Sequence, residues 1–151
     1  MISKKIVVSG MRPTGRIHLG NYNSVLKSWI KLQNEYECFF FIADIHSLTT
    51  HYNNTENIKE NSIYMIIDWL SAGLNHKKCT IFMQSDIKET FELYSILSMV
   101  TPLGLLERIP SFKDNNNINL KTLGFLGYPV LQGADILILN GDYVPIGIDQ
   151  I

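Results

Sequence analysis

The sequence predicts an α/β fold built on a doubly wound parallel sheet, and three observations lead to it. Short apolar runs, each suited to a strand covered on both faces, occur at residues 6–8, 38–43 and 80–83. Stretches with the apolar spacing of a helix separate them, and this alternation calls for parallel strands joined by right-handed crossovers. A chain of 151 residues is long enough for one domain with a proper core.

The first strand and the first helix flank a turn rich in glycine and proline. The run at 6–8 gives way to this turn, and a helical apolar pattern then covers residues 19–34. Three glycines remove side chains where a ligand would approach the backbone: Gly10, Gly15 and Gly20. A strand, a loop and a helix N-terminus in this order can hold a phosphate chain against free N–H groups. His18 and Asn21 stand at the helix mouth, and Arg12 adds a fixed positive charge.

The second strand and helix bring polar groups to the sheet edge. The strand at 38–43 ends in a polar segment, 44–50, at the edge where open α/β sheets bind ligands. We expect Asn53 or Thr55 to cap a second helix that ends at 73–75. Its expected core-facing stripe has five apolar residues: Ile63, Ile66, Ile67, Leu70 and Leu74.

The third strand, at 80–83, precedes a helix that we expect Ser85 or Asp86 to cap and that stops near Pro102. The residues at 103–112 are mixed in character, with a short helix expected around Glu107 and Arg108. The polar, asparagine-rich segment at 113–121 has no periodicity and is expected to be an exposed, mobile loop.

The last part of the chain is apolar again. Pro129 suits the first turn of a helix that runs through Leu139, and the sequence Asn-Gly-Asp at 140–142 ends it. A further strand is expected at 143–146, and the chain stops where another helix is about to begin.

Composition sets limits on function. The formal net charge of −1 provides no basic field for nucleic acid, so any RNA contact must come from local patches or from parts not present. Cys38 and Cys79 lie in apolar segments, which fits reduced core thiols and a cytoplasmic location. No apolar run has membrane-spanning length, the amino terminus is too short in apolar residues for a signal peptide, and no spacing indicates a protein metal site.

Asp135 is the most informative single residue, because helical spacing places it in the most apolar helix of the chain. A buried carboxylate without partners costs several kcal/mol or becomes protonated. It therefore faces a crevice, pairs with an arginine or a backbone donor, or accepts a hydrogen bond from the N–H of a ligand. An apolar pocket with one such acceptor discriminates by roughly 10⁴–10⁵ against a ligand that lacks the donor.

Four motifs resemble the tryptophanyl-tRNA synthetases, a family of class I aminoacyl-tRNA synthetases. They are a His-x-Gly-Asn signature at 18–21 preceded by Ser-Gly-x-x-Pro-Thr-Gly, the Asp-Ile-His-Ser-Leu-Thr segment at 44–49, Tyr-Pro-x-Leu-x-x-Ala-Asp-Ile-Leu at 128–137 and Val-Pro-Ile-Gly-x-Asp-Gln at 144–150. Each motif alone is a weak signal, but together they keep the order and spacing of the family from about residue 6 to 150. The resemblance implies a Rossmann-like catalytic domain that is truncated at its C-terminal end.

The resemblance also implies roles for individual residues. The catalytic signature contributes His18, Gly20 and Asn21. The expected ATP site comprises Arg12, Pro13, Thr14, Gly20, Asn21, Gly147, Ile148 and Asp149. The expected tryptophan site comprises Asp135, Tyr128, Gln132, His46 and Gln150, with apolar walls from Val8, Val144 and Ile146. Several family members carry Gln where this chain has Arg12, and Met where it has Gln132. Arg12 strengthens the attraction for phosphate, and Gln132 adds polarity to the ring pocket.

The implied reaction is ATP-dependent activation of L-tryptophan to tryptophanyl-adenylate, followed by transfer to tRNA(Trp). Positioning and charge stabilisation dominate such a step, with Mg²⁺ carried on ATP and His46 orienting the substrate. The family is homodimeric. The family's second, lysine-rich signature loop and its anticodon-binding domain are absent from residues 1–151. We therefore expect a fragment that binds tryptophan and ATP weakly and does not charge tRNA at a useful rate.

Three other interpretations remain open at this point. A tyrosyl-type synthetase shares the fold and the reaction, although the 128–137 segment argues against it. Small nucleotidyltransferases have a related signature and this chain length, but they lack the ending at 144–150. The fragment is alternatively a non-catalytic binding or dimerisation module. Titration with tryptophan and then ATP separates these interpretations.

Overall fold

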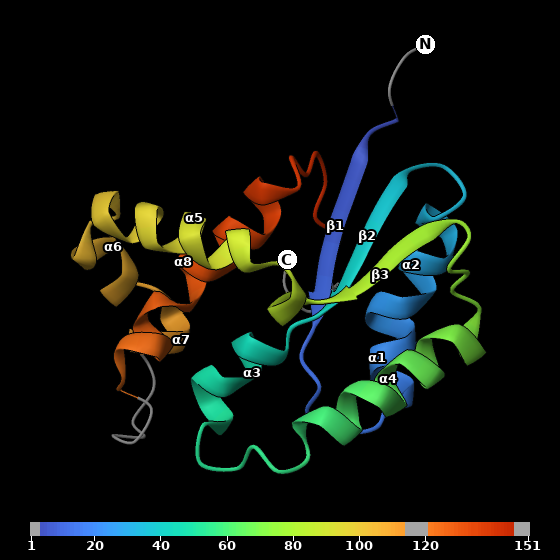
Figure 1. Ribbon diagram of the computed structural model, residues 1–151, viewed down its shortest axis with the longest axis horizontal. Coiled ribbons are helices and arrows are strands. Elements are labelled where there is room, and N and C mark those ends of the chain that lie inside the picture. The colour runs from blue at the N-terminus through green and yellow to red at the C-terminus, as the bar shows by residue number, and fades with distance from the viewer. Residues whose placement is uncertain (1–3, 114–120, 147–151) are drawn as a thin grey trace.

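The structure, a computed structural model, describes residues 4–113 and 121–146. Its sheet has three parallel strands in the order β1-β2-β3: β1 (Ile6–Met11), β2 (Glu37–Ile42) and β3 (Cys79–Met83). The predicted parallel α/β sheet is thereby confirmed, and helices cover both of its faces (Figure 1).

A further segment joins the sheet on the other edge of β1. Val7 forms a parallel bridge with Tyr143, and the Val8 N–H donates to the Tyr143 carbonyl at 3.0 Å. The strand predicted at 143–146 is thus limited to one bridge within the described residues. The chain runs outward from β1 to β3 and then returns to the opposite side of β1. Open α/β sheets bind ligands at the carboxyl ends of strands where the order reverses in this way.

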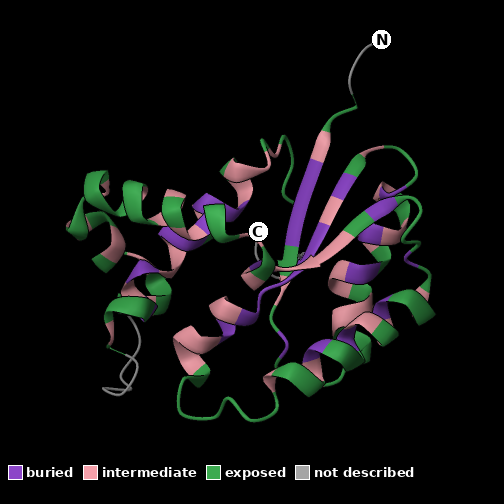
Figure 2. Cartoon of the chain, in the orientation of Figure 1, coloured by how far each residue is buried: buried purple, intermediate pink, exposed green. Residues whose placement is uncertain are grey.

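Alternate residues of the strands build two cores, one on each face. Val7 and Phe40 face the helices α2 (Lys27–Leu32) and α4 (Ile58–Ala72). Val8 and Phe41 face the other side, toward α8 (Leu123–Ile138), whose Ile136 packs there. Figure 2 shows the buried residues concentrated along the strands and on the helix faces turned toward them.

The larger core centres on an aromatic cluster. Trp29 of α2 stacks on Phe40 of β2 with 4.3 Å between ring centroids, and Trp69 of α4 meets Trp29 edge-on at 5.0 Å. All three side chains are completely buried. Such offset and edge-to-face pairs contribute beyond their buried area, so this cluster fixes how α4 sits on the sheet.

The predicted stripe on α4 is wrong in three of its five positions. Ser62, Met65 and Trp69 form the buried face of this helix, and Ile66 packs beside them. The other predicted residue that reaches the core is Leu74. The remaining three members of the stripe are exposed: Ile63, Ile67 and Leu70. Because α4 is apolar around much of its circumference, spacing alone did not identify the face that the large Trp69 ring would bury.

The first predicted helix is one continuous helical run. It comprises α1 (Leu19–Asn21), the π-helical η1 (Tyr22–Leu26) and α2, and its last residue is Leu32 rather than residue 34. Single π-helical turns inside helices are often found at functional sites.

The starts of the next two long helices differ from the predictions. The N-cap of α4 is Asn57, not Asn53 or Thr55, because a turn from Thr55 to Ile58 delays the helix. Ser85 and Asp86 do not cap α5 (Lys88–Val100) either. They lie in the 3₁₀ turn η2 (Gln84–Asp86), where the Ser85 N–H donates to the Asp44 carboxylate, and Ile87 precedes the helix.

Shorter helices complete the fold. The polar segment after β2 folds as α3 (Asp44–His51). The mixed region contains α6 (Leu103–Glu107) and α7 (Pro110–Lys113), so the predicted short helix near Glu107 is confirmed. The loop predicted at 113–121 falls almost entirely outside the described residues.

Helix α8 begins earlier than predicted. Thr122 caps it by accepting the Phe125 N–H at 3.1 Å, and Pro129 lies inside the helix rather than in its first turn. The helix ends at Ile138, followed by Asn140 with a left-handed φ of 51°, as the Asn-Gly pair indicated. Within the described ranges, none of the helices is both long and apolar enough to cross a bilayer.

Candidate functional site

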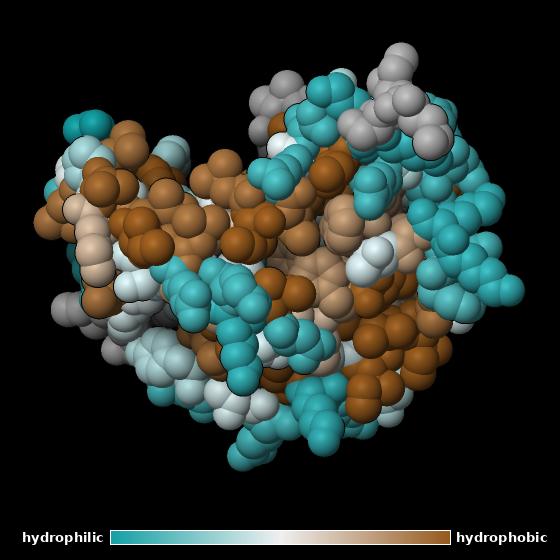
Figure 3. All heavy atoms as spheres, turned by 45° about the horizontal axis from the view of Figure 1, so that its top comes forward, coloured by the Kyte–Doolittle hydropathy of each residue, from teal (hydrophilic) through white to brown (hydrophobic). Residues whose placement is uncertain are grey.

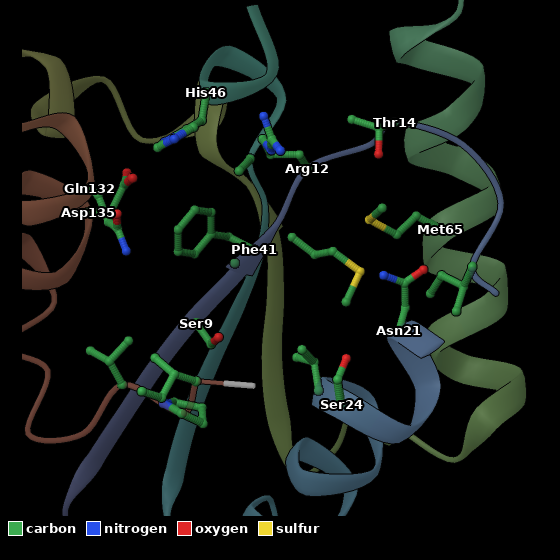
Figure 4. Close-up of a pocket in the computed structure, with 18 of the residues that line it drawn as sticks. Ser9, Arg12, Thr14, Asn21, Ser24, Phe41, His46, Met65, Gln132 and Asp135 are labelled. Atoms are coloured by element: carbon green, nitrogen blue, oxygen red, sulfur yellow. The ribbon is translucent and has the colours of Figure 1, made fainter. Parts of the chain in front are cut away.

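A cavity of about 520 Å³ opens at the carboxyl end of β1. The turn after β1, the N-terminus of α3, the middle of α8 and the segment beyond Tyr143 surround it (Figure 4). Its volume suits a small-molecule ligand. Ten of the predicted site residues line it: Val8, Arg12, Thr14, His18, Asn21, His46, Gln132, Asp135, Val144 and Ile146.

The remaining predicted site residues lie elsewhere. Pro13 is buried and Gly20 lies within α1, and neither lines the cavity. Tyr128 lines a neighbouring apolar hollow of about 360 Å³, and its ring meets His46 at 5.4 Å between centroids. Gly147, Ile148, Asp149 and Gln150 fall outside the described residues.

The helix mouth is held by a reciprocal pair of caps. His18 Nδ1 accepts the backbone N–H groups of Gly20 at 3.1 Å and Asn21 at 3.3 Å. Asn21 Oδ1 in turn accepts the His18 N–H at 3.3 Å, which completes a capping box. Because Nδ1 is an acceptor, the neutral ring carries its proton on Nε2, which is a donor. The Asn21 amide N–H₂ and this imidazole N–H are therefore uncharged side-chain donors that the helix mouth can offer an anion.

Two glycines allow close packing beside the cavity. A Cβ on Gly10 would lie 2.5 Å from the Phe41 ring, and one on Gly20 would lie 2.8 Å from the His18 ring. Both distances are shorter than any side chain tolerates, so a larger residue at either position would displace a ring from the cavity wall.

The two arginines of the turn have different partners. Arg16 forms a bidentate ion pair with Asp68 of α4, at 2.7 and 3.1 Å, and the Ile17 N–H also donates to that carboxylate. This contact anchors the turn to α4. Arg12 lines the cavity and donates only to the Thr50 hydroxyl at 3.3 Å, with no carboxylate partner among the described residues. Its charge is thus available to a ligand.

Asp135 is buried, and its carboxylate is bound by one side chain. The Gln84 Nε2 donates to both oxygens, at 3.0 and 2.8 Å. Burial raises the pKa of Asp135 to about 7, the Gln84 hydrogen bonds oppose this, and the charge of Asp44 adds to the rise. Of the alternatives open from sequence, Asp135 both faces the cavity and has an internal partner, which is an amide rather than an arginine or the backbone.

His46 enters the cavity from the first turn of α3. Burial lowers its pKa to about 4, and the nearby Arg12 charge contributes. The ring is therefore neutral at pH 7. A neutral imidazole can orient a substrate by hydrogen bonding without adding charge to the cavity.

Sequence reasoning missed several residues that shape the site. Gln84 and Phe41 are the main ones, and Met65 of α4 also lines the cavity. Gln84 directly follows the buried strand β3, so the strand-end rule that singled out 44–50 would also have identified it. Phe41 and Met65 carry no such signal, because apolar side chains in a strand and a helix predict only a core.

The fold is that of a class I aminoacyl-tRNA synthetase, and the chain belongs to that family. Residues 3–151 match the family described as tRNA synthetases class I (W and Y). The chain is 55% identical over 149 residues to the tryptophan--tRNA ligase of Ralstonia nicotianae, covering 96% of this chain and 37% of that protein. The resemblance to tryptophanyl-tRNA synthetases is confirmed by such relatives.

Solved structures give the same result. A tryptophanyl-tRNA synthetase from Campylobacter jejuni, complexed with ADP and tryptophan, is 41% identical and has a TM-score of 0.88. The match covers 97% of this chain and 46% of the Campylobacter jejuni chain. A tyrosyl-tRNA synthetase from Archaeoglobus fulgidus, at 23% identity and a TM-score of 0.78, shares the fold. The chain thus spans roughly half the length, or less, of these relatives.

Proposed function

We propose that this chain is the amino-terminal part of the catalytic domain of a tryptophan--tRNA ligase. The enzyme activates L-tryptophan with ATP and transfers it to tRNA(Trp) in protein synthesis. The observation that carries this proposal is a single cavity that contains the buried acceptor Asp135 and the capped helix mouth at 18–21. Had the two half-sites opened into different cavities, one reaction could not have used both.

The amino acid side of the cavity suits an indole. Val8, Val144 and Ile146 provide apolar wall, and Asp135 provides one hydrogen-bond acceptor for a ring N–H. His46 and Gln132 lie on the same side, and the Tyr128 ring meets the His46 ring edge-on. We assign Gln150 to this side as well from the family motif. A phenol presents its hydroxyl at another position, so this arrangement favours tryptophan over tyrosine.

The opposite side suits a triphosphate. His18 and Asn21 offer neutral donors, Arg12 a positive charge, and the helical run from Leu19 its partial positive end. We assign Pro13, Thr14, Gly20, Gly147, Ile148 and Asp149 to ATP from the family motifs. Mg²⁺ is assigned to the ATP phosphates, as the family resemblance implies.

The proposed step forms one bond and breaks one. An oxygen of the tryptophan carboxylate attacks the α-phosphorus of ATP in line, and the bond to the bridging oxygen of pyrophosphate breaks. The carboxylate is already ionised, so the step needs no general base, and His46 is assigned to orientation. Fixed donors then stabilise the charge that develops on the phosphate oxygens.

The proposed enzyme is longer than this chain and acts as a dimer. This chain covers less than half the length of the Ralstonia nicotianae and Campylobacter jejuni relatives. We assign the second signature loop and the anticodon-binding domain to the part of the enzyme outside residues 1–151. Apolar side chains gather on the arm that holds α5 and α6 (Figure 3), which supports a homodimer contact there. Two free, buried cysteines support a cytoplasmic location.

Calorimetric titration with tryptophan, tyrosine and ATP tests the proposal. We expect tryptophan to bind in preference to tyrosine, and ATP-pyrophosphate exchange by the full-length protein to depend on tryptophan. Preference for tyrosine would favour the tyrosyl-type alternative, and the absence of all binding would favour a non-catalytic module. Calorimetry is preferable to fluorescence because Trp29 and Trp69 are buried in the core on the other face of the sheet.

A further inference from the structure

One fully buried glutamine links three elements beside the cavity. Gln84 follows β3 and is 1% exposed. Its Nε2 donates to both carboxylate oxygens of Asp135 in α8, and its Oε1 accepts the His46 backbone N–H of α3 at 2.9 Å. The side chain thus connects the carboxyl end of β3 to two helices that contribute His46 and Asp135 to the cavity.

The orientation of this amide is dictated by its partners. A carboxylate only accepts hydrogen bonds and a backbone N–H only donates. Rotating the amide by half a turn would place its oxygen against the Asp135 carboxylate and its N–H₂ against the His46 N–H, so both contacts would become repulsive. Gln84 is therefore committed to donating toward Asp135.

Little else holds the Asp135 carboxylate. The titratable and charged groups around it are Asp44 and His46 of α3 and Arg12 after β1. Ile87, which precedes α5, and Thr90 of α5 lie beside it and do not titrate, and α6 lines neither hollow beside it. Gln84 is the only hydrogen-bond donor recorded for this carboxylate within the described residues.

We propose that Gln84 is the positioning residue for the acceptor Asp135, fixing its two oxygens so that one faces the ring N–H of the amino acid. The proposal rests on the assignment of tryptophan as the substrate. Gln84 does not line the cavity and acts through Asp135. Its donated hydrogen bonds keep the carboxylate in the charged form that accepts most strongly, and they restrict its rotation. Selectivity for an N–H on the ligand thus depends on a residue that the ligand does not touch.

The direct test is to titrate Asp135 in the Gln84→Met variant. NMR of the Asp135 side-chain carboxyl carbon monitors this titration. Removing the hydrogen bonds that Gln84 donates should move the titration midpoint upward by about one pH unit. Gln84→Glu, which has the same length but no donor when ionised, provides a second variant if Gln84→Met does not fold, and it should also raise the midpoint. An unchanged midpoint in a folded variant would overturn the proposal.

Selectivity supplies an independent measurement. Tryptophan is compared with its analogue that carries sulfur in place of the ring N–H, by calorimetry at pH 7.5 on the full-length protein. We expect Gln84→Met to reduce the preference for tryptophan about tenfold, and to recover part of it at pH 9, where Asp135 is charged again. A preference equal to that of the unmodified protein would contradict the positioning role.

The chain offers a matched control in Gln33. This glutamine is also buried, donates to the Ile30 and Gly73 carbonyls at 3.1 Å and accepts the Asn75 N–H at 2.8 Å, away from the cavity. Gln33→Met should lower stability by a similar amount and leave both the Asp135 midpoint and the selectivity unchanged. If both variants change selectivity equally, general destabilisation explains the effect and the proposal fails.

The two proposals can fail separately. An unmodified protein that does not distinguish tryptophan from the sulfur analogue refutes tryptophan as the substrate, whereas the carboxyl titration still reports on the Gln84–Asp135 contact. Clear selection of tryptophan together with an unchanged midpoint in Gln84→Met leaves the function intact and removes only the role of Gln84.

Discussion

His18 combines a structural and a chemical role in one ring. Its Nδ1 caps the helical run by accepting two backbone N–H groups, and this fixes the proton on Nε2. The cap and the donor are therefore separable by mutation, since asparagine is among the best N-cap residues but has no imidazole.

We expect His18→Asn to keep the stability of the protein within about 0.5 kcal/mol while lowering the adenylation rate by about 10²-fold or more. His18→Ala should lower the rate similarly and also cost about 1 kcal/mol of stability, because the cap is lost. Denaturant unfolding and ATP-pyrophosphate exchange measure the two effects. Normal exchange in His18→Asn would show that the ring contributes only the cap.

Asp135 should make the stability of the protein fall as pH rises. Its pKa in the folded protein is about 7, above the ordinary value of 3.8, so between those values the folded protein holds a proton that the unfolded chain has released. The stability of Asp135→Asn relative to the unmodified protein should thus increase from pH 4 to pH 7, by at most about 4 kcal/mol.

Urea unfolding of both proteins across this range measures the difference. The comparison is necessary because His46 has the opposite effect. Its pKa is lowered to about 4 in the folded protein, so its contribution makes the protein less stable as pH falls below 6.5. Parallel pH profiles for the two proteins would show that Asp135 does not titrate in this window.

The environment of Asp135 was predictable from the sequence only in part. The burial of Asp135 followed from its place in an apolar helix, and a position facing a crevice was one of the alternatives that this burial left open. Its internal partner did not follow, because Gln84 lies 51 positions away in sequence and is one of several polar residues at strand ends. Pairing across elements depends on three-dimensional packing, which local spacing does not encode.

Among the elements, β2 can place its Phe41 ring over β1 at the base of the cavity because Gly10 has no side chain. We expect Gly10→Ala to force the Phe41 ring aside and to cost about 1 to 3 kcal/mol, with weaker tryptophan binding. Adding Phe41→Leu should restore much of the stability of Gly10→Ala. Thermal unfolding of the single and double variants measures the coupling, and purely additive effects would rule out the contact.

The sequence predicted whether a segment forms a helix or a strand better than it predicted which helix face is buried and where each helix begins. The continuous apolar run of β2 and the Asn-Gly-Asp sequence that ends α8 are local signals, and both predictions held. No local signal identified the buried face of α4, because contacts with other elements in the Trp29–Phe40–Trp69 cluster determine which face is buried. Pro129 suggested a helix start, but the Thr122 cap seven residues earlier determines where α8 begins.

For the whole molecule, the exposed apolar surface leads to a prediction about assembly. Met99 and Val100 at the end of α5 are 80% and 73% exposed. We expect the double change Met99→Glu and Val100→Glu to convert a dimer into a monomer with little effect on stability. Ile67→Glu on α4, also an exposed apolar position, is the matched control and should leave the dimer intact. Sedimentation equilibrium measures both, and dissociation by Ile67→Glu alone would place the contact on α4.

The pairing of Val7 with Tyr143 has a consequence for synthesis of the chain. The contacts from β1 to this segment, such as Ile6 N–H to Asp142, span 136 positions. At 5–20 residues per second, a ribosome needs on the order of ten seconds to supply the second partner after the first. Throughout that interval one edge of the amino-terminal strand has no neighbour. The substrate pocket is consequently incomplete until the segment around Tyr143 has been synthesised.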